Sequence, residues 1–139
     1  MQFTRRDTLV MGAGAAVATF MPLQVFADAT EDVSAEFAMG EAITDGGVEL
    51  TAPEIAENGN TVPISVNAPG AVAVLILATG NPSPKVIGFN FGPRAGGQTA
   101  STRCRLAGTQ DVVALAKMAD GSVKRASATV KVTIGGCGG

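Results

Sequence analysis

Short runs in which apolar and polar residues alternate fill the chain from about residue 48 to its C-terminal tail. A period of two is typical of β-strands that bury one face, and the turn-forming residues between the runs mark where each strand ends. The run at 71–78 is apolar throughout, which predicts a fully buried strand. We expect strands at 48–52, 61–67, 71–78, 86–91, 99–106, 111–118 and 122–134.

Turn and helix signals complete this pattern. The Asp-Gly pair at 120–121 predicts a tight hairpin between the last two strands. Ahead of the strands, residues 30–40 predict a helix, because Val33 and Phe37 share one face and Gly40 ends the segment. The expected fold class is mainly β: an immunoglobulin-like antiparallel β-sandwich with a short N-terminal helix and a flexible glycine-rich C-terminal arm.

The N-terminus has the pattern of an export signal. Arg5 and Arg6 form a twin-arginine pair, an apolar stretch follows at 9–20, and small residues precede Asp28. The apolar stretch is short and rich in glycine, whereas a membrane span needs about 20 apolar residues. We therefore expect residues 1–27 to be a twin-arginine signal peptide that is cleaved after Ala27. The mature protein is expected to be periplasmic, with no membrane attachment after cleavage.

The mature chain is expected to form one small domain at 28–134, followed by an arm at 135–139. Its charge is uneven: nine acids and no base lie between residues 28 and 57, and eight bases and two acids lie from residue 85 onward. Either the two halves pair across one fold, or the basic half surrounds the arm and favours anionic cargo. The bases are not interleaved with aromatic residues, which together with export argues against a nucleic-acid partner.

The chain ends in a single cysteine between two glycine pairs, and this is its candidate functional site. Glycine leaves the backbone nearly unrestricted and adds no side-chain bulk, so such a segment suits insertion into a narrow pocket of another protein. The expected covalent attachment site for a substrate is Cys137, and the expected source of the arm's flexibility is Gly135, Gly136, Gly138 and Gly139.

This thiol has no activating neighbour in the sequence. A thiolate is the nucleophile, and an ordinary cysteine with a pKa near 8.5 is only slightly ionised at neutral pH. No base lies beside Cys137, so we expect activation by partner proteins and no catalytic residue in this chain. Histidine is absent, and two cysteines without histidine are a poor ligand set for zinc, copper or haem. We therefore expect no metal site and no cofactor other than sulfur intermediates bound covalently to Cys137.

The second cysteine, Cys104, is expected to be a core residue. Alternation along its strand places Cys104 and Leu106 on the apolar face and Arg103 and Arg105 on the opposite face. The competing account is an intramolecular disulfide between Cys104 and Cys137, since the periplasm is oxidising. That disulfide would require the core thiol to be exposed and would leave the glycines without a purpose.

The tail closely resembles the C-terminal signature of the SoxY family, the sulfur carriers of the thiosulfate-oxidising Sox system. The resemblance covers essentially the whole mature chain, and the Gly-Gly-Cys-Gly-Gly ending is its specific part. At Cys104 the chain departs from the aliphatic residue expected in the family. The segments that carry the resemblance are 53–59, 80–84, 89–93, 109–114 and 130–139.

The resemblance implies a carrier and not an enzyme. Family members pair with a second sandwich subunit, SoxZ, as a heterodimer, or as a heterotetramer when two cysteines equivalent to Cys137 join. A haem enzyme conjugates thiosulfate to that cysteine, a hydrolase releases sulfate, and a sulfane dehydrogenase oxidises the sulfur that is left as a cysteine persulfide.

Two other functions fit parts of the sequence. A ubiquitin-like sulfur carrier would use the terminal Gly138-Gly139 pair as a thiocarboxylate, but that chemistry needs ATP and leaves Cys137 without a role. A structural sandwich would assemble through an intermolecular disulfide at Cys137. Replacement of Cys137 by serine would leave the first alternative working, whereas a disulfide dimer alone would not distinguish the second from the family.

Overall fold

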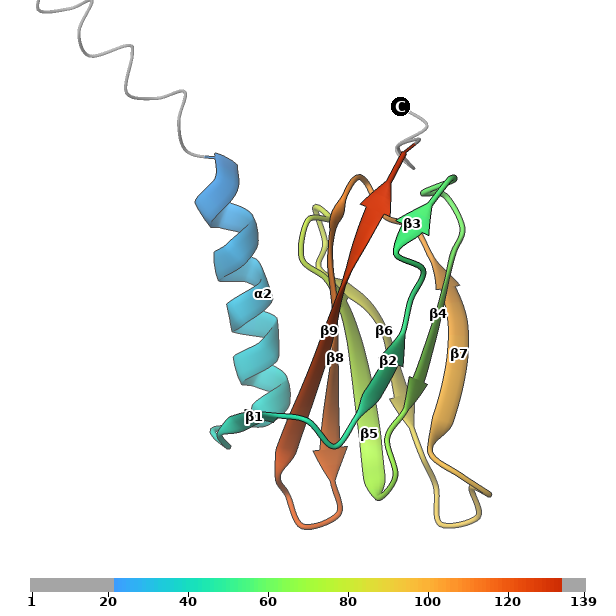
Figure 1. Ribbon diagram of the computed structural model, residues 1–139. Coiled ribbons are helices and arrows are strands. Elements are labelled where there is room, and N and C mark those ends of the chain that lie inside the picture. The colour runs from blue at the N-terminus through green and yellow to red at the C-terminus, as the bar shows by residue number, and fades with distance from the viewer. Residues whose placement is uncertain (1–21, 134–139) are drawn as a thin grey trace, which may run out of the picture.

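The computed structural model describes residues 22–133 as a β-sandwich with one helix beside it (Figure 1). Within that range the sandwich consists of a six-stranded sheet and a three-stranded sheet. The elements in chain order are α2 (Pro22–Ala38), β1 (Ile43–Asp45), β2 (Glu49–Thr51), β3 (Ile55–Ala56), β4 (Val62–Asn67), β5 (Ala71–Ala78), β6 (Lys85–Asn90), β7 (Thr99–Cys104), β8 (Gln110–Met118) and β9 (Val123–Val132). This confirms the mainly β fold class expected from the sequence.

The longer strands follow the alternation in the sequence. The large sheet has the order β1-β9-β8-β5-β6, and the small sheet has the order β2-β4-β7. The long strands pair antiparallel: β4 with β7, β5 with both β6 and β8, and β8 with β9. A tight turn in which Gly121 has a φ of 92° joins β8 to β9. A left-handed backbone of this kind favours glycine, as the Asp-Gly pair indicated.

Two short strands were not predicted, and both pair with β9. Ile43 of β1 lies opposite Val123, and Ile55 of β3 lies opposite Lys131, in parallel register in both cases. The segment 43–56 therefore runs alongside β9 from its start to its end and joins the small sheet in between, through β2 (Figure 1). Neither strand lies in an alternating run of the sequence, so only its distant partner reveals it.

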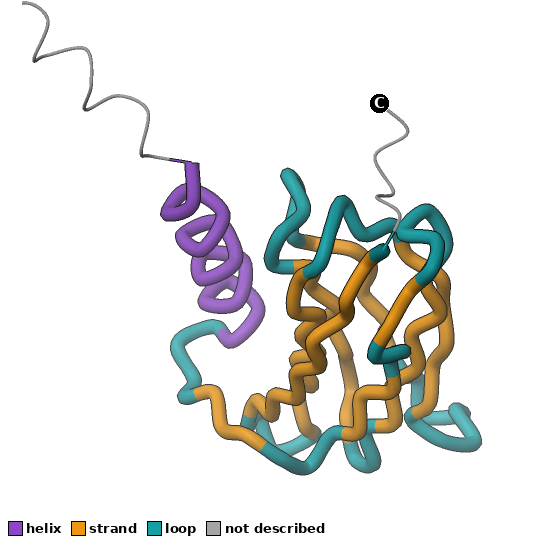
Figure 2. Tube along the Cα trace, turned by 45° about the horizontal axis from the view of Figure 1, so that its top comes forward, coloured by secondary structure: helices purple, strands orange, loops and turns teal. Residues whose placement is uncertain are grey.

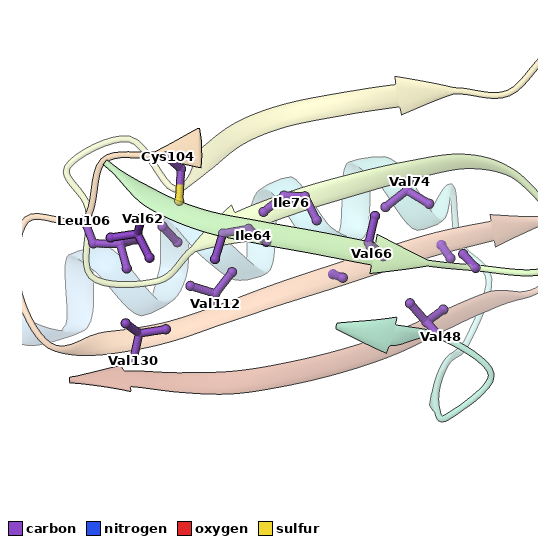
Figure 3. Close-up of a cluster of buried hydrophobic side chains, with 14 of the residues drawn as sticks. Val48, Val62, Ile64, Val66, Val74, Ile76, Cys104, Leu106, Val112 and Val130 are labelled. Atoms are coloured by element: carbon purple, nitrogen blue, oxygen red, sulfur yellow. The ribbon is translucent and has the colours of Figure 1, made fainter. Parts of the chain in front are cut away.

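The main core lies between the two sheets. Side chains from both inner faces interdigitate, as expected for a sandwich, and Figure 3 shows them pointing toward one another from β4, β5 and β8. The fully buried large members include Val62, Ile64, Val66, Val74, Ile76, Leu106, Val112 and Val130.

A second apolar cluster lies on the outer face of the large sheet, beneath α2. Val33 and Phe37 pack against Leu75, Leu77 and other residues of the sheet. This explains why β5 is apolar throughout, since one of its faces lines the main core and the other lies under the helix. Figure 2 shows α2 beside the strands and outside the sandwich.

The helix is longer than the sequence predicted. It begins at Pro22, and Thr30, the first residue of the predicted helix, is an internal residue whose carbonyl accepts a hydrogen bond from Ser34 Oγ. Proline is favoured in the first turn of a helix, and no glycine interrupts the segment before Gly40. The helix ends as predicted, because Met39 and Gly40 have φ values of 51° and 86°. The predicted cleavage after Ala27 falls inside α2.

Replacing Ile76 by alanine tests the main core. Ile76 is fully buried between the sheets, and truncating such a side chain leaves a cavity that typically costs about 2–5 kcal/mol of unfolding free energy. Val72 on the same strand is 42 % exposed, so Val72→Ala is the matched control, with an expected change within about 0.5 kcal/mol. Urea denaturation measures both, and equal effects would contradict the assignment of this core.

Candidate functional site

The end of β9 is held by hydrogen bonds on both sides. The Lys131 amide donates to the Glu54 carbonyl at 2.9 Å, and the Thr133 amide donates to the Ala56 carbonyl at 3.1 Å. Between them, the Val132 amide donates to Thr109 Oγ1 at 3.0 Å. The backbone is thus tied to the sandwich as far as Thr133, the last residue that the structure describes. We call residues 131–133 the root, because the predicted arm follows them.

The predicted site residues themselves lie outside residues 22–133. This applies to the thiol of the tail, to the glycines around it and to the twin arginines of the leader: Cys137, Gly135, Gly136, Gly138, Gly139, Arg5 and Arg6. The roles predicted for them therefore remain predictions. The structure shows where the tail begins: at one end of the sandwich, beside β3 (Figure 1).

A hydrogen-bonded group of loops lies at the same end of the sandwich. The buried Gln110 side chain accepts from the Gly80 amide at 2.9 Å and donates to Asn81 Oδ1 at 2.9 Å. Asn81 in turn donates to the Arg105 carbonyl at 2.7 Å and accepts from the Ala107 amide at 2.9 Å. These bonds join the 79–84 loop to the 105–109 loop. Sequence reasoning did not identify Gln110 as their centre.

Gly80 is needed at this point for space. A Cβ on Gly80 would lie 3.0 Å from the Cβ of Gln110, closer than side-chain carbons normally approach. The absence of a side chain lets the two loops come together, so that Gln110 satisfies its polar atoms although it is buried. Gln110 is the first residue of β8 and pairs with Val130, which directly precedes the root.

Charges of both signs border the root. Glu54 and Glu57 flank β3 beside it, and Lys131 is part of it. The root itself is therefore not surrounded by basic residues alone, and the expectation for the arm concerns residues outside the described range. The alternative is supported at the other end of β9, where Arg125 Nε donates to Asp45 Oδ1 at 2.8 Å.

The Arg125–Asp45 pair links the acidic and basic halves of the sequence. The hydrogen bond from Arg125, and then its charge, hold the pKa of Asp45 below the ordinary value. A lowered carboxyl pKa stabilises the fold above the carboxyl's unfolded-state pKa, and this contribution is lost as the pH falls through the lowered value. Both side chains are well exposed, so the contribution is small.

Cys104 is a buried free thiol, as the alternation predicted. It ends β7 with 5 % of its surface exposed, and its sulfur lies among apolar residues of the main core near Val62 and Leu106 (Figure 3). Burial raises the pKa of the Cys104 thiol. Because the thiolate is the reactive form, Cys104 is inert on both counts, and the structure assigns it to packing.

One cavity in the described part of the molecule lies away from the root. It is a groove of about 440 Å³ between α2 and the outer face of the large sheet. Its floor is apolar, with Val113 and Leu115, and its rim carries Glu31, Glu41 and Arg125. Its described lining residues include neither Cys104 nor any root residue.

Residues 22–133 contain neither a cluster of metal ligands nor a membrane-spanning helix. In that range, no three side chains of histidine, cysteine, aspartate or glutamate gather in a way that would hold a metal ion. Nor does the described part of the chain contain a helix with the length and apolar character needed to cross a bilayer.

Alkylation of the native protein separates the two thiols. We expect iodoacetamide to modify the peptide that contains Cys137 and to leave Cys104 unmodified until the protein is unfolded, because Cys104 is buried and its pKa is raised. Peptide mass spectrometry before and after denaturation measures this. Equal rates at both cysteines in the native protein would contradict the assignment of Cys104 to the core.

Three comparisons relate this architecture to known proteins. The family model described as sulfur oxidation protein SoxY matches residues 34–137, a range that includes Cys137. No curated protein sequence matches the chain. A solved structure, the sulfur carrier protein SoxY from Chlorobium limicola f thiosulfatophilum, is 36 % identical and has a TM-score of 0.68. The alignment covers 78 % of this chain and 99 % of that one.

More distant structures share the fold alone. The superoxide reductase (neelaredoxin) from Ignicoccus hospitalis is 14 % identical over 63 % of this chain and 80 % of its own, with a TM-score of 0.55. A putative superoxide reductase from Thermotoga maritima is 16 % identical over 70 % and 91 % of the two chains, with a TM-score of 0.53. The family match covers most of the chain and extends beyond the root to the tail cysteine, and the chain belongs to the SoxY family of sulfur oxidation proteins.

Proposed function

We propose that this protein is a periplasmic sulfur carrier that binds thiosulfate-derived intermediates covalently on Cys137 and presents them to the enzymes of thiosulfate oxidation. The observation that carries the proposal is the family match, which includes Cys137 four residues beyond a hydrogen-bonded root. The solved relative is itself described as a sulfur carrier protein. In this proposal Cys137 is an attachment point, and the chain performs no catalysis of its own.

The chemistry at Cys137 follows from the reactivity of thiols. Joining the thiol to the outer sulfur of thiosulfate forms a sulfur–sulfur bond and releases one proton and two electrons, which a haem enzyme accepts. Water then releases sulfate and leaves a cysteine persulfide, whose outer sulfur a sulfane dehydrogenase oxidises. Each step requires an activating group, and each partner supplies it in its own pocket. Covalent attachment keeps the intermediate from being lost between partners.

The described residues support this division of roles. Cys104 is buried in the core with a raised pKa, so it does not compete for the sulfur intermediates. Cys104 is not among the described lining residues of the groove beside α2. We therefore place the chemistry on the tail and in the partners, and assign to the sandwich the task of holding the root.

Intact mass analysis of the protein from thiosulfate-grown cells tests the carrier function. We expect sulfur and sulfur-oxo adducts confined to the C-terminal peptide that contains Cys137. Cys137→Ser should abolish the adducts, whereas Cys104→Ala should retain them. Deletion of Gly138 and Gly139 should leave the sulfur attached through Cys137, and loss of all adducts in that deletion alone would favour a terminal thiocarboxylate. Only unmodified thiol, or adducts on Cys104, would overturn the proposal.

We further propose that the chain works with a second sandwich subunit of the SoxZ type that has no leader of its own and is exported together with this chain through the twin-arginine route. Affinity purification of the tagged chain from the periplasm, under reducing conditions, should yield this subunit in equal amount, also from the Cys137→Ser variant. Recovery of a lone, stable monomer would contradict this pairing. A partner lost with Cys137→Ser would indicate assembly through a disulfide.

A further inference from the structure

The root depends on a single side chain where the backbone ladder ends. The last backbone pair between β8 and β9 is Gln110 with Val130. Beyond it, Thr109 continues the pairing with its hydroxyl, which accepts from the Val132 amide at 3.0 Å and lies 3.5 Å from the Val132 carbonyl oxygen. A threonine side chain thus replaces the missing main-chain partner on this side of β9.

The opposite side of the root is held by β3. The Lys131 and Thr133 amides donate to the carbonyls of Glu54 and Ala56, and Thr133 Oγ1 lies 3.4 Å from the Ala56 carbonyl oxygen. Amides of a strand point alternately to its two sides. The three successive root amides therefore alternate between β3 and Thr109, and removing the Thr109 hydroxyl leaves the root supported from one side.

We propose that Thr109 is a positioning residue that fixes Thr133 as the pivot of the arm and thereby sets the reach of Cys137. This inference rests on the carrier function proposed above. From Thr133 to Cys137 there are four residues, which span at most about 13–14 Å at about 3.3–3.6 Å each. A root that opened back to Val130 would lengthen this tether to seven residues, about 23–25 Å.

A longer tether has a measurable cost for delivery of the thiol. The effective concentration of a tethered group falls roughly as the −3/2 power of tether length once the span is exceeded. Lengthening from four to seven residues therefore lowers it about twofold. When its hydrogen bonds are intact, the root limits the reach of Cys137 to the region just beyond one end of the sandwich. A pocket that receives the thiol must approach that end.

Amide hydrogen exchange, measured by NMR on the full chain, tests whether Thr109 holds the root, and it needs no sulfur chemistry. The Thr109→Val variant keeps the shape of the side chain but removes its hydroxyl, and Thr109→Ser retains the hydroxyl. The informative amides are those of Lys131 and Thr133, because their acceptors in β3 are unchanged by the substitution. We expect exchange at both to be about fivefold faster in Thr109→Val and unchanged in Thr109→Ser, as loss of one hydrogen bond would produce.

Thr129→Val is the matched control. Thr129, like Thr109, is an exposed threonine; it lies on β9, two residues before the root. Its hydroxyl donates to Asp111 Oδ1 at 2.6 Å. We expect this variant to leave exchange at Lys131 and Thr133 unchanged. Unchanged exchange in Thr109→Val, or equal acceleration in Thr129→Val, would overturn the role of Thr109.

A second experiment tests whether the hold of Thr109 on the root affects the yield of Cys137 adducts. Deleting Gly135 shortens the tether by one residue, so we expect a lower yield of Cys137 adducts in thiosulfate-grown cells. Adding Thr109→Val should restore part of that yield, because the opened root returns length, whereas Thr129→Val should not. Failure of this rescue would overturn the link between root and reach. Absence of adducts in the parent chain would instead overturn the carrier function, with the exchange result unaffected.

Discussion

Pairing of β9 on both sides is the constraint on which the rest of the structure depends. β8 pairs with one edge of β9 along most of its length, and the short strands β1 and β3 pair with the other edge at its two ends. The same strand contributes Val130 to the main core and leads directly into the tail. Fixing β9 therefore closes the sandwich, covers an exposed strand edge and determines where the thiol-bearing segment begins.

The sequence was most informative where the signal is local. Alternation located the long strands, and for β5 the prediction matches the observed bounds, because its buried faces leave only apolar residues from Ala71 to Ala78. It also placed Cys104 in the core. The strands β1 and β3 have no local signal, since neither lies in an alternating run and their partner, β9, lies far along the chain. The role of Gln110 was equally hidden, because a glutamine is buried only where distant loops satisfy it.

The candidate site was recognised from the tail alone, and the structure adds what composition cannot show. The Gly-Gly-Cys-Gly-Gly ending identifies the thiol, but nothing in those letters tells where the preceding strand stops being held. That limit depends on Thr109 and Ala56, which come from different parts of the chain. The charges at the root also come from distant parts of the chain: β3 brings acidic residues to the root from the first half of the sequence.

The pairing of β1 with β9 also has a consequence for the order in which the protein folds. Thr44 and Lys124, which are paired in register, lie eighty residues apart, so β1 cannot pair until the last strand has been synthesised. Contacts between distant residues form late because a long loop must close first. The pairings of β9 with β1 and with β3 both require this last strand. A cell would thus have an ordered root only in chains that have finished folding, which ties the presentation of the tail to the integrity of the whole domain.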